Sequence, residues 1–206
     1  MFLDPSMSSK ISQGVTTCVA GNCGISLAPF NYKGEVPAPI ALLGKSEVFR
    51  FPRVSDYKEE FNNKPSSVNL ALLTGHSMLR VEAMNGEFAR PATTKEISKM
   101  VDKLKLALED GSIGLSTGLA YPAANDAPTT EIIELAKILP EFDGIFTTHM
   151  RNEAVDVIKS VKENFKIPVF AYQVSGEYST IVNGIDKGIV DEKIIIEILT
   201  SFKRAG

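Results

Sequence analysis

The stretch SVNLALLTGHS, residues 67–77, decides the fold of this chain. Its short apolar run is followed directly by Gly75 and His76. A run of this length, bounded by turn residues, is typical of a strand buried within a sheet. Four other stretches have the same form: GVTTCVAGNCG (14–24), SIGLSTG (112–118), GIFTTHM (144–150) and IPVFAYQVSGE (167–177). The sequence therefore predicts five buried strands, each ending in small or polar residues.

Helical patterns separate these strands. The clearest is TTKEISKMVDKLKLALEDG, residues 93–111, which places its apolar residues on one face. Thr93 and Glu96 form a possible capping box at its start, and Gly111 gives a stop signal at its end. Three further segments look amphipathic: 129–139, 154–165 and 191–204. Strands that alternate with helices predict parallel βαβ units.

The predicted fold class is α/β, a partial (β/α)8 or TIM-type barrel of about five βα units. A closed barrel needs eight strands and typically ~250 residues, so we expect an incomplete barrel. Polar residues fall at the C-terminal ends of the predicted strands, where chemistry gathers in such folds. These residues are Asn22, Cys23, His76, Ser116, Thr117, His149 and Ser175. The Pro-rich segment 25–66 interrupts the alternation and predicts a long loop or small insertion over the barrel mouth.

Composition and charge argue against several classes of protein. A net charge of −3, with Lys and Arg spread along the chain, argues against nucleic-acid binding. No apolar stretch approaches the ~20 residues of a membrane span. The N-terminus lacks the features of a signal peptide, and no disulfide is expected between Cys18 and Cys23. We therefore expect a cytoplasmic protein that binds neither nucleic acid nor membrane.

Cys23 and His149 are the best pair of candidate metal ligands. Zinc accepts thiolate and imidazole, and catalytic zinc sites usually have three protein ligands and one open position. Both residues come from strand ends that could converge, but a buried cysteine and a hydrogen-bonded histidine would fit the pattern too. His76, with Ser77 and Arg80, could likewise bind an anion or be hydrogen-bonded within the barrel mouth. By spacing alone, a buried cysteine and a hydrogen-bonded histidine are the preferred interpretation of Cys23 and His149, and the hydrogen-bonded interpretation of His76 is at least as well supported as anion binding.

The segment GLSTGLAYP, residues 114–122, is rich in glycine. It is no phosphate loop, because the sequence contains neither G-x-x-x-x-G-K-[ST] nor G-x-G-x-x-G. Its glycines permit tight turns, which leave Tyr121 to project from the loop. The sequence also lacks G-x-S-x-G, so serine-hydrolase chemistry has little support.

Several segments together resemble the N-acyl-D-amino-acid deacylases, or D-aminoacylases, of the amidohydrolase superfamily. They are KISQGVTTCVAGNCGISLAP, LLTGHSMLR, GLSTGLAYPAA, TTEIIELAK and FTTHMRNE, and the resemblance covers about residues 9–153. It implies a zinc-dependent barrel that hydrolyses the amide bond of N-acyl-D-amino acids, which are small-molecule substrates. It also implies that Cys23 of G-N-C-G and His149 of T-H-M-R are zinc ligands. Tyr121, by the same resemblance, helps to hold the substrate.

Three features of that family are absent from the sequence. They are the H-x-H motif of the first barrel strand, a second zinc histidine in an SHHK-like strand, and the catalytic aspartate further downstream. The small β-domain that flanks the family's barrel has no counterpart either. Two of three expected zinc ligands therefore remain, Cys23 and His149, and no catalytic residue is identified.

The C-terminal segment resembles a different family. Residues 156–206, with AYQVSGEY and LTSFKRAG, are similar to porphobilinogen synthase, also called 5-aminolevulinate dehydratase, a lyase of tetrapyrrole biosynthesis. In that family the serine of VSGEY binds a substrate carboxylate, which implies Ser175 here. The family's Schiff-base lysine lies in an M-V-K-P strand, whose place is taken here by THMR, without a lysine. Lysine-based condensation is therefore unsupported.

These resemblances predict two segments, a deacylase-like barrel fragment at 1–153 and a porphobilinogen synthase-like βα segment at 154–206. As their origin, a chimeric or truncated reading frame is preferred over a genuine fusion that still folds, and both are preferred over a misleading second resemblance. We expect a zinc hydrolase fragment with little activity alone. The alternatives are a non-catalytic incomplete barrel, which could self-associate through its open edges, and a porphobilinogen synthase-like lyase.

Overall fold

The computed structural model describes residues 4–44, 46–151 and 177–205. The chain divides into two compact units, Met1–Arg151 and Asn152–Gly206. The predicted helix at 154–165 lies outside the described residues, as does the predicted strand at 167–177 except for its last residue. Among the described residues, no helix has the length and apolar character needed to cross a membrane.

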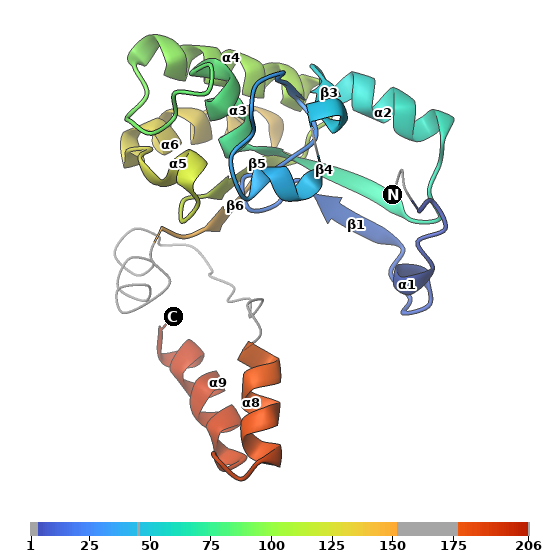
Figure 1. The fold of residues 1–206 in the computed structure, drawn as a ribbon, viewed down its shortest axis with the longest axis vertical. Helices are drawn as coiled ribbons and strands as arrows, with labels where there is room; N and C mark the ends of the chain where they lie inside the picture. Colours follow the sequence, from blue (N-terminus) through green and yellow to red (C-terminus); the bar gives the residue numbers. More distant parts are fainter. Residues whose placement is uncertain (1–3, 45, 152–176, 206) are drawn as a thin grey trace. The chain divides into compact units, whose positions relative to one another are not determined.

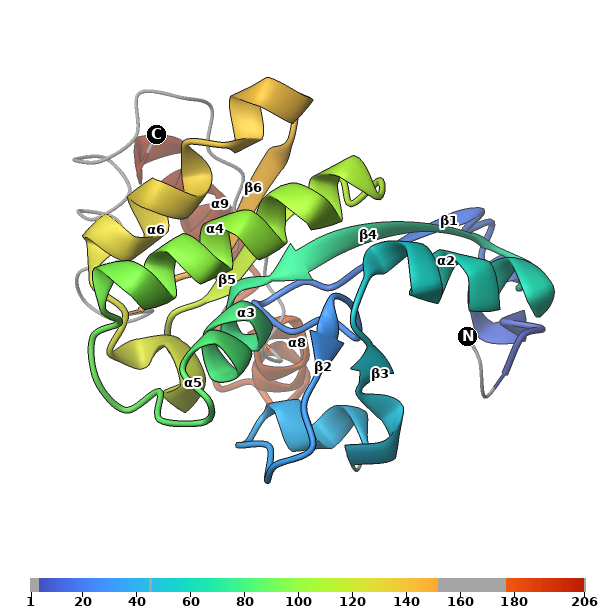
Figure 2. The same ribbon diagram turned by 90° about the horizontal axis from the view of Figure 1, so that it is seen from above.

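The first unit is built on a parallel sheet of four strands (Figure 1). The strands are β1 (Thr17–Ala20), β4 (Asn69–Gly75), β5 (Gly114–Gly118) and β6 (Ile145–His149). Their spatial order is the order of the sequence, since β1 pairs with β4, β4 with β5, and β5 with β6. The sheet is curled like part of a TIM-type barrel (Figure 2). The predicted α/β fold class is thus confirmed, and four of the five predicted strands are seen.

Helices that follow β4 and β5 pack against the sheet (Figure 2). They are α3 (His76–Ala83), α4 (Thr94–Glu109), α5 (Pro122–Asn125) and α6 (Thr129–Ala136), followed by the 3-10 helix η3 (Leu139–Phe142). Leu79, Met100, Leu104, Leu115 and Leu135 are all buried in one cluster between helices and sheet. These apolar residues recur at helical spacing in α4, which explains why the helix covers the sheet with one face.

The predicted capping box begins α4. The Thr93 hydroxyl accepts the backbone N–H of Glu96 at 3.3 Å, and the Glu96 carboxylate accepts the backbone N–H of Thr93 at 2.8 Å. At the other end Gly111 has φ +96°, a left-handed conformation that favours glycine and ends the helix. Both predicted helix signals are therefore confirmed.

The segment 25–66 is a small insertion with structure of its own. It contains β2 (Phe30–Asn31), the 3-10 helices η1 (Ile40–Leu43) and η2 (Ser46–Val48), β3 (Arg50–Phe51) and α2 (Val54–Asn63). β2 and β3 form an antiparallel pair. Helix α2 was not expected from the sequence, because only Val54 and Tyr57 of its residues are buried and its apolar pattern is therefore weak. A further short helix, α1 (Ser8–Ile11), precedes β1.

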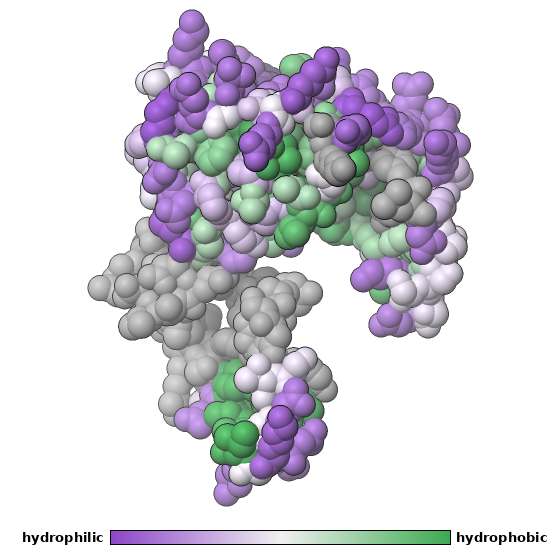
Figure 3. All heavy atoms as spheres, viewed as in Figure 1, coloured by the Kyte–Doolittle hydropathy of each residue, from purple (hydrophilic) through white to green (hydrophobic). Residues whose placement is uncertain are grey.

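The described part of the second unit contains two helices. They are α8 (Glu177–Asp186) and α9 (Lys193–Ala205), which confirms the helix predicted at 191–204. Ile195, Ile196 and Leu199 of α9 are exposed. Hydrophobic side chains accordingly lie at the surface of this helical pair (Figure 3). α9 has a strongly one-sided distribution of apolar residues, as its sequence predicts.

Candidate metal and substrate site

The predicted polar residues of the first unit lie at one edge of the sheet, where its parallel strands end. β4 ends at Gly75, so His76 comes directly after it, and His149 is the last residue of β6. Cys23 lies in the loop that follows β1. The carboxyl ends of neighbouring parallel strands share an edge, which is where α/β barrels carry their sites. Ser175, the candidate of the lyase interpretation, lies outside the described residues.

Cys23 has an unusual backbone conformation. The loop Gly21–Gly24 has positive φ at Gly21 (+86°), Cys23 (+54°) and Gly24 (+74°). A residue with a side chain in this region is uncommon, and the conformation costs on the order of 1 kcal/mol. It persists only where the surrounding structure fixes it. Gly21 must be glycine for a second reason, because a Cβ there would overlap the backbone carbonyl of Leu73.

Hydrogen bonds from three elements hold this loop. The Ser116 hydroxyl of β5 accepts the N–H of Gly24 at 3.0 Å and donates to the carbonyl of Gly21. The N–H of Ser77, in the first turn of α3, donates to the carbonyl of Gly24 at 3.0 Å. From β6, the Thr147 hydroxyl donates to the Asn22 side-chain oxygen at 3.0 Å. The loop with Cys23 is thus attached to β5, α3 and β6.

Gly118 brings the three predicted site residues together. It is buried and pairs with His149 across β5 and β6, and the N–H of Leu119 donates to the His149 carbonyl at 2.9 Å. A Cβ on Gly118 would overlap the carbonyl oxygen of Cys23 and would lie 2.6 Å from Cδ2 of Tyr121. The carbonyl of Cys23, the ring of Tyr121 and the backbone of His149 therefore all lie next to Gly118, which has no room for a side chain.

Tyr121 and His149 are in direct contact. The Tyr121 hydroxyl is hydrogen-bonded to Nδ1 of His149 at 3.0 Å, and the ring centroids lie 4.9 Å apart at an interplanar angle of 69°. Tyr121 immediately precedes α5, whose first residue is Pro122. A hydrogen bond at one ring nitrogen orients a histidine and assigns metal binding to the other nitrogen. The hydrogen bond with Tyr121 thus occupies Nδ1 of His149, and Nε2 is the ring nitrogen outside this contact.

His76 lies in a buried ionic cluster rather than facing a ligand. Its Nε2 is 2.8 Å from Oε1 of Glu131, and Nη1 of Arg80 donates to Oε2 of the same carboxylate at 2.5 Å. All three side chains are fully buried. Burial lowers the pKa of His76, against the opposing effect of Glu131. The anion held by His76 and Arg80 is therefore the protein's own Glu131, which supports the hydrogen-bonded interpretation.

Glu131 was missed by sequence reasoning. Burial raises the pKa of its carboxyl group, but hydrogen bonds from His76 and Arg80 outweigh burial and the net pKa is lowered. Glu131 lies in the first turn of α6, whereas its partners lie on α3, 51 to 55 positions earlier. No local pattern in the sequence marks a contact of this kind.

The two predicted donor side chains are of types that zinc binds, but a catalytic zinc site usually has three. Cys23 supplies a sulfur and His149 a nitrogen, both of which zinc accepts. Within residues 4–44, 46–151 and 177–205, no three His, Cys, Asp or Glu side chains are grouped so that they could hold a metal ion. Two donors of the correct chemistry are thus present, whereas a catalytic zinc site usually has three.

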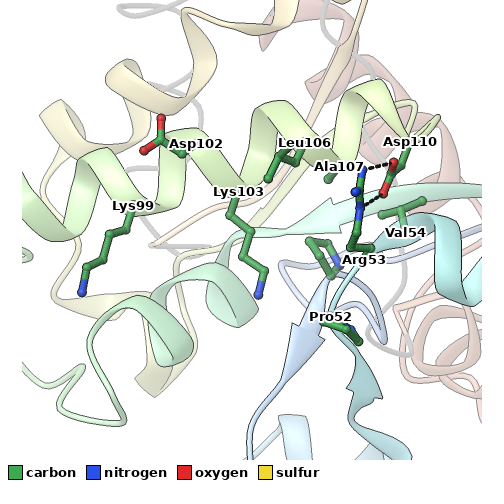
Figure 4. A pocket seen from close by; sticks show the side chains of 10 residues that line it. Pro52, Arg53, Val54, Lys99, Asp102, Lys103, Leu106, Ala107 and Asp110 are labelled. Carbon is green, nitrogen blue, oxygen red and sulfur yellow. Dashed lines mark hydrogen bonds and ion pairs between the residues drawn. The ribbon is translucent and has the colours of Figure 1, made fainter.

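A hollow of about 290 Å³ lies away from this edge, between α2 and α4 (Figure 4). It is lined by Pro29, Pro52, Arg53, Val54, Lys99, Asp102, Lys103, Leu106, Ala107 and Asp110. Its arginine is already paired, since Arg53 donates to the Asp110 carboxylate at 3.0 and 2.6 Å. None of the predicted site residues lines this hollow.

Comparison with known proteins gives different relatives for the two parts of the chain. The D-aminoacylase of Alcaligenes xylosoxydans xylosoxydans is 45% identical over 161 residues, which are 78% of this chain and 33% of that protein. The N-acyl-D-glutamate deacylase of Bordetella bronchiseptica, solved with zinc and a phosphonate inhibitor that mimics the tetrahedral intermediate, superposes with a TM-score of 0.72. It is 40% identical over 77% of this chain and 33% of that one.

Residues 152–206 match the family model of Delta-aminolevulinic acid dehydratase. The enzyme of that name from Methanothermus sociabilis is 52% identical over 52 residues, which are 25% of this chain and 16% of that protein. Both resemblances predicted from the sequence are thus confirmed as homology. The chain spans about a third of the length of the deacylases that it matches.

Proposed function

We propose that this chain, as a homologue of the D-aminoacylases over most of its length, carries part of a zinc site that hydrolyses N-acyl-D-amino acids. Cys23 and His149 would hold the metal, and Tyr121 would contact the substrate. The observation that supports this best is the meeting of these three residues around Gly118. The zinc-bound relative supports the choice of metal.

The chemistry follows from the residues present. When bound, zinc polarises the scissile carbonyl and lowers the pKa of a bound water. Cys23 offers a thiolate, held in place by the hydrogen-bonded loop Gly21–Gly24. His149 offers Nε2 of an imidazole that Tyr121 orients through Nδ1. The Tyr121 hydroxyl stands beside the ligand side chain, where it can also donate to a bound acyl group.

The 206-residue chain, assayed alone, is expected to hydrolyse N-acyl-D-amino acids slowly or not at all. Among the described residues, Cys23 and His149 are joined by no third donor, and two ligands hold zinc less well than three. With only two zinc ligands in the described part of the chain, the favoured alternative is a non-catalytic protein with an open sheet. The lyase alternative has less support, because the matched segment begins beyond the THMR strand end, which contains no lysine.

Zinc binding by variants of the two cysteines tests the proposal. Cys23→Ser should lower the affinity for zinc by at least about tenfold, because a thiolate is a much better zinc ligand than a hydroxyl. Cys18→Ser is the matched control, since Cys18 is the other cysteine and lies within β1, away from its C-terminal end. Affinity would be measured by competition with a chelating dye. Equal affinities in the two variants would show that Cys23 is no ligand.

Two turnover assays separate the remaining alternatives. Hydrolysis of N-acetyl-D-glutamate and N-acetyl-D-methionine, with the L-isomers as controls, would be followed with added zinc. Condensation of 5-aminolevulinate would be followed in the same preparation. Zinc binding without turnover fits the partial site. Turnover of a D-substrate shows that the chain carries a working site, and condensation would overturn the hydrolase assignment.

A further inference from the structure

We propose that Ser116 is a positioning residue for Cys23. Its hydroxyl would bridge the two sides of the loop Gly21–Gly24 and so fix the place of the thiol. The metal-binding purpose of this arrangement rests on the proposed function, but the arrangement itself can be tested without metal.

The Ser116 hydroxyl bonds on both sides of Cys23. It accepts the N–H of Gly24, the next residue, at 3.0 Å and donates to the carbonyl of Gly21, two residues before Cys23. A hydroxyl carries one donor and two acceptor positions, so it can make both bonds at once. Ser116 is fully buried, which shields these bonds from water. The Ser116 side chain is thus hydrogen-bonded to the backbone on both sides of the turn that contains Cys23.

This turn needs such a bridge. Cys23 is held at φ +54°, a conformation that a residue with a side chain rarely adopts. The flanking Gly21 and Gly24 have the widest backbone freedom of any residue type, so they do not impose that conformation. The bonds from Ser77 and Thr147 fix the loop at Gly24 and Asn22, but neither joins Gly21 to Gly24. The Ser116 hydroxyl makes that link.

Ser112 provides a matched control. It is also a buried serine, two residues before β5, with its hydroxyl 2.9 Å from Oγ1 of Thr74 and 3.1 Å from the carbonyl of Leu72. Removing its hydroxyl therefore deletes buried hydrogen bonds between β4 and the segment that leads into β5. It does not touch the loop Gly21–Gly24. A general weakening of the sheet would appear in both variants, whereas a role in positioning Cys23 would appear in Ser116→Ala only.

The first experiment measures the rate of alkylation of Cys23 by iodoacetamide in the full chain. Cys18→Ser is included in every variant, so that one thiol remains. Ser116→Ala should react roughly tenfold faster, because two hydrogen bonds no longer hold the turn closed. Ser112→Ala should stay within about twofold of its parent. Equal acceleration in both variants, or none in Ser116→Ala, would overturn the proposal.

A second pair of variants allows for a failure of Ser116→Ala to fold. Ser116→Thr keeps the hydroxyl. Ser116→Val introduces a side chain of nearly the same shape as threonine but without the hydroxyl. Circular dichroism would establish which variants are folded. Slow alkylation in the threonine variant and fast alkylation in a folded valine variant support the bridging role. If the alanine and valine variants both fail to fold, the hydroxyl serves the fold as a whole and the positioning role is overturned.

Titration with Co²⁺ then links Ser116 to the metal. Thiolate coordination gives Co²⁺ a charge-transfer absorption, which reports on Cys23 itself rather than on stability. Ser116→Ala should weaken this band and raise the Co²⁺ dissociation constant roughly tenfold, with Ser112→Ala unchanged. A parent chain that binds neither Co²⁺ nor zinc would refute the proposed function. The alkylation contrast would still decide the role of Ser116.

Discussion

At the scale of single residues, the contact between Tyr121 and His149 carries the first prediction. Tyr121→Phe removes the hydroxyl that lies 3.0 Å from Nδ1 of His149 and leaves the ring in place. Loss of a hydrogen bond that orients a metal-binding side chain commonly weakens metal binding by 10- to 100-fold. We therefore expect the affinity for zinc to fall by about tenfold. The measurement is a chelator-competition titration.

Tyr57→Phe is the control for this substitution. Tyr57 is a buried tyrosine, whereas Tyr121 is half-buried, and it lies on α2 and packs against Phe51 rather than against the site. Its variant should bind zinc like the parent chain. Unchanged affinity in Tyr121→Phe would show that the Tyr121 hydroxyl does not orient His149 for metal binding.

His76 predicts a pH dependence of stability. Because burial lowers the pKa of His76 below 6.5, the unfolded chain takes up a proton there at a higher pH than the folded chain. The free energy of unfolding should therefore fall as the pH drops below 6.5, by at most about 1.4 kcal/mol per pH unit. Glu131 adds a loss of the same sign at lower pH, because its pKa is lowered from 4.5.

Urea unfolding at about pH 7.5 and about pH 5.5 isolates the contribution of His76, since carboxyl groups titrate mainly below this window. His76→Gln should lose less stability between the two pH values than the parent chain does. An identical pH dependence in His76→Gln and in the parent would contradict the prediction.

For single residues, the sequence indicates which side chains could bind a metal better than it indicates which side chains are in contact. Cys23 and His149 are recognisable by type and by their place after apolar runs. The bridging role of Ser116 and the pairing of Glu131 with His76 depend on contacts between distant segments. Such contacts follow from the three-dimensional course of the chain, and no local pattern encodes them.

At the scale of elements, the capping box of α4 gives a prediction about stability. Thr93→Ala removes the hydroxyl that accepts the N–H of Glu96, and should lower the free energy of unfolding by about 1 kcal/mol. Thr94→Ala, one residue further into the helix, is the matched control and should change it by a few tenths at most. Urea denaturation of both variants at one pH provides the measurement. A smaller loss for Thr93→Ala than for Thr94→Ala would show that the cap contributes nothing.

Elements were predictable where their pattern is strong. β4 and the strands beside it are short apolar runs bounded by small or polar residues. Helix α4 has apolar residues at helical spacing, a capping box and a stop signal. Helix α3 was not expected, because it begins at His76, with no intervening turn to mark the change from strand to helix. Helix α2 buries only Val54 and Tyr57 and is otherwise polar, so tertiary packing rather than sequence periodicity establishes it.

At the scale of the whole molecule, the open edges of the sheet predict association. In the described part of the chain, β1 and β6 each pair with one other strand. Val19 of β1 is 55% exposed. An exposed edge with apolar side chains is a template for pairing between chains. We therefore expect concentration-dependent self-association, measurable by sedimentation velocity.

Val19→Lys should reduce this association, because a charged side chain on an edge strand opposes pairing. Leu42→Lys is the control with the same change of charge, since Leu42 is 86% exposed but lies on η1, away from the sheet edge. Equal effects of the two variants would assign the result to net charge. A parent chain that stays monomeric at every concentration would contradict the prediction itself.

The order of strands in the sheet has a consequence for how the chain reaches its structure. Each new strand along the sequence pairs with the strand before it in the sheet, β4 with β1, β5 with β4 and β6 with β5. During synthesis, β4, β5 and β6 therefore each find their partner strand already made, and the sheet can grow in the direction of translation. His149 ends β6, the last of these strands, so the sheet edge that follows β1 gains this histidine only after β1, β4 and β5 have been made.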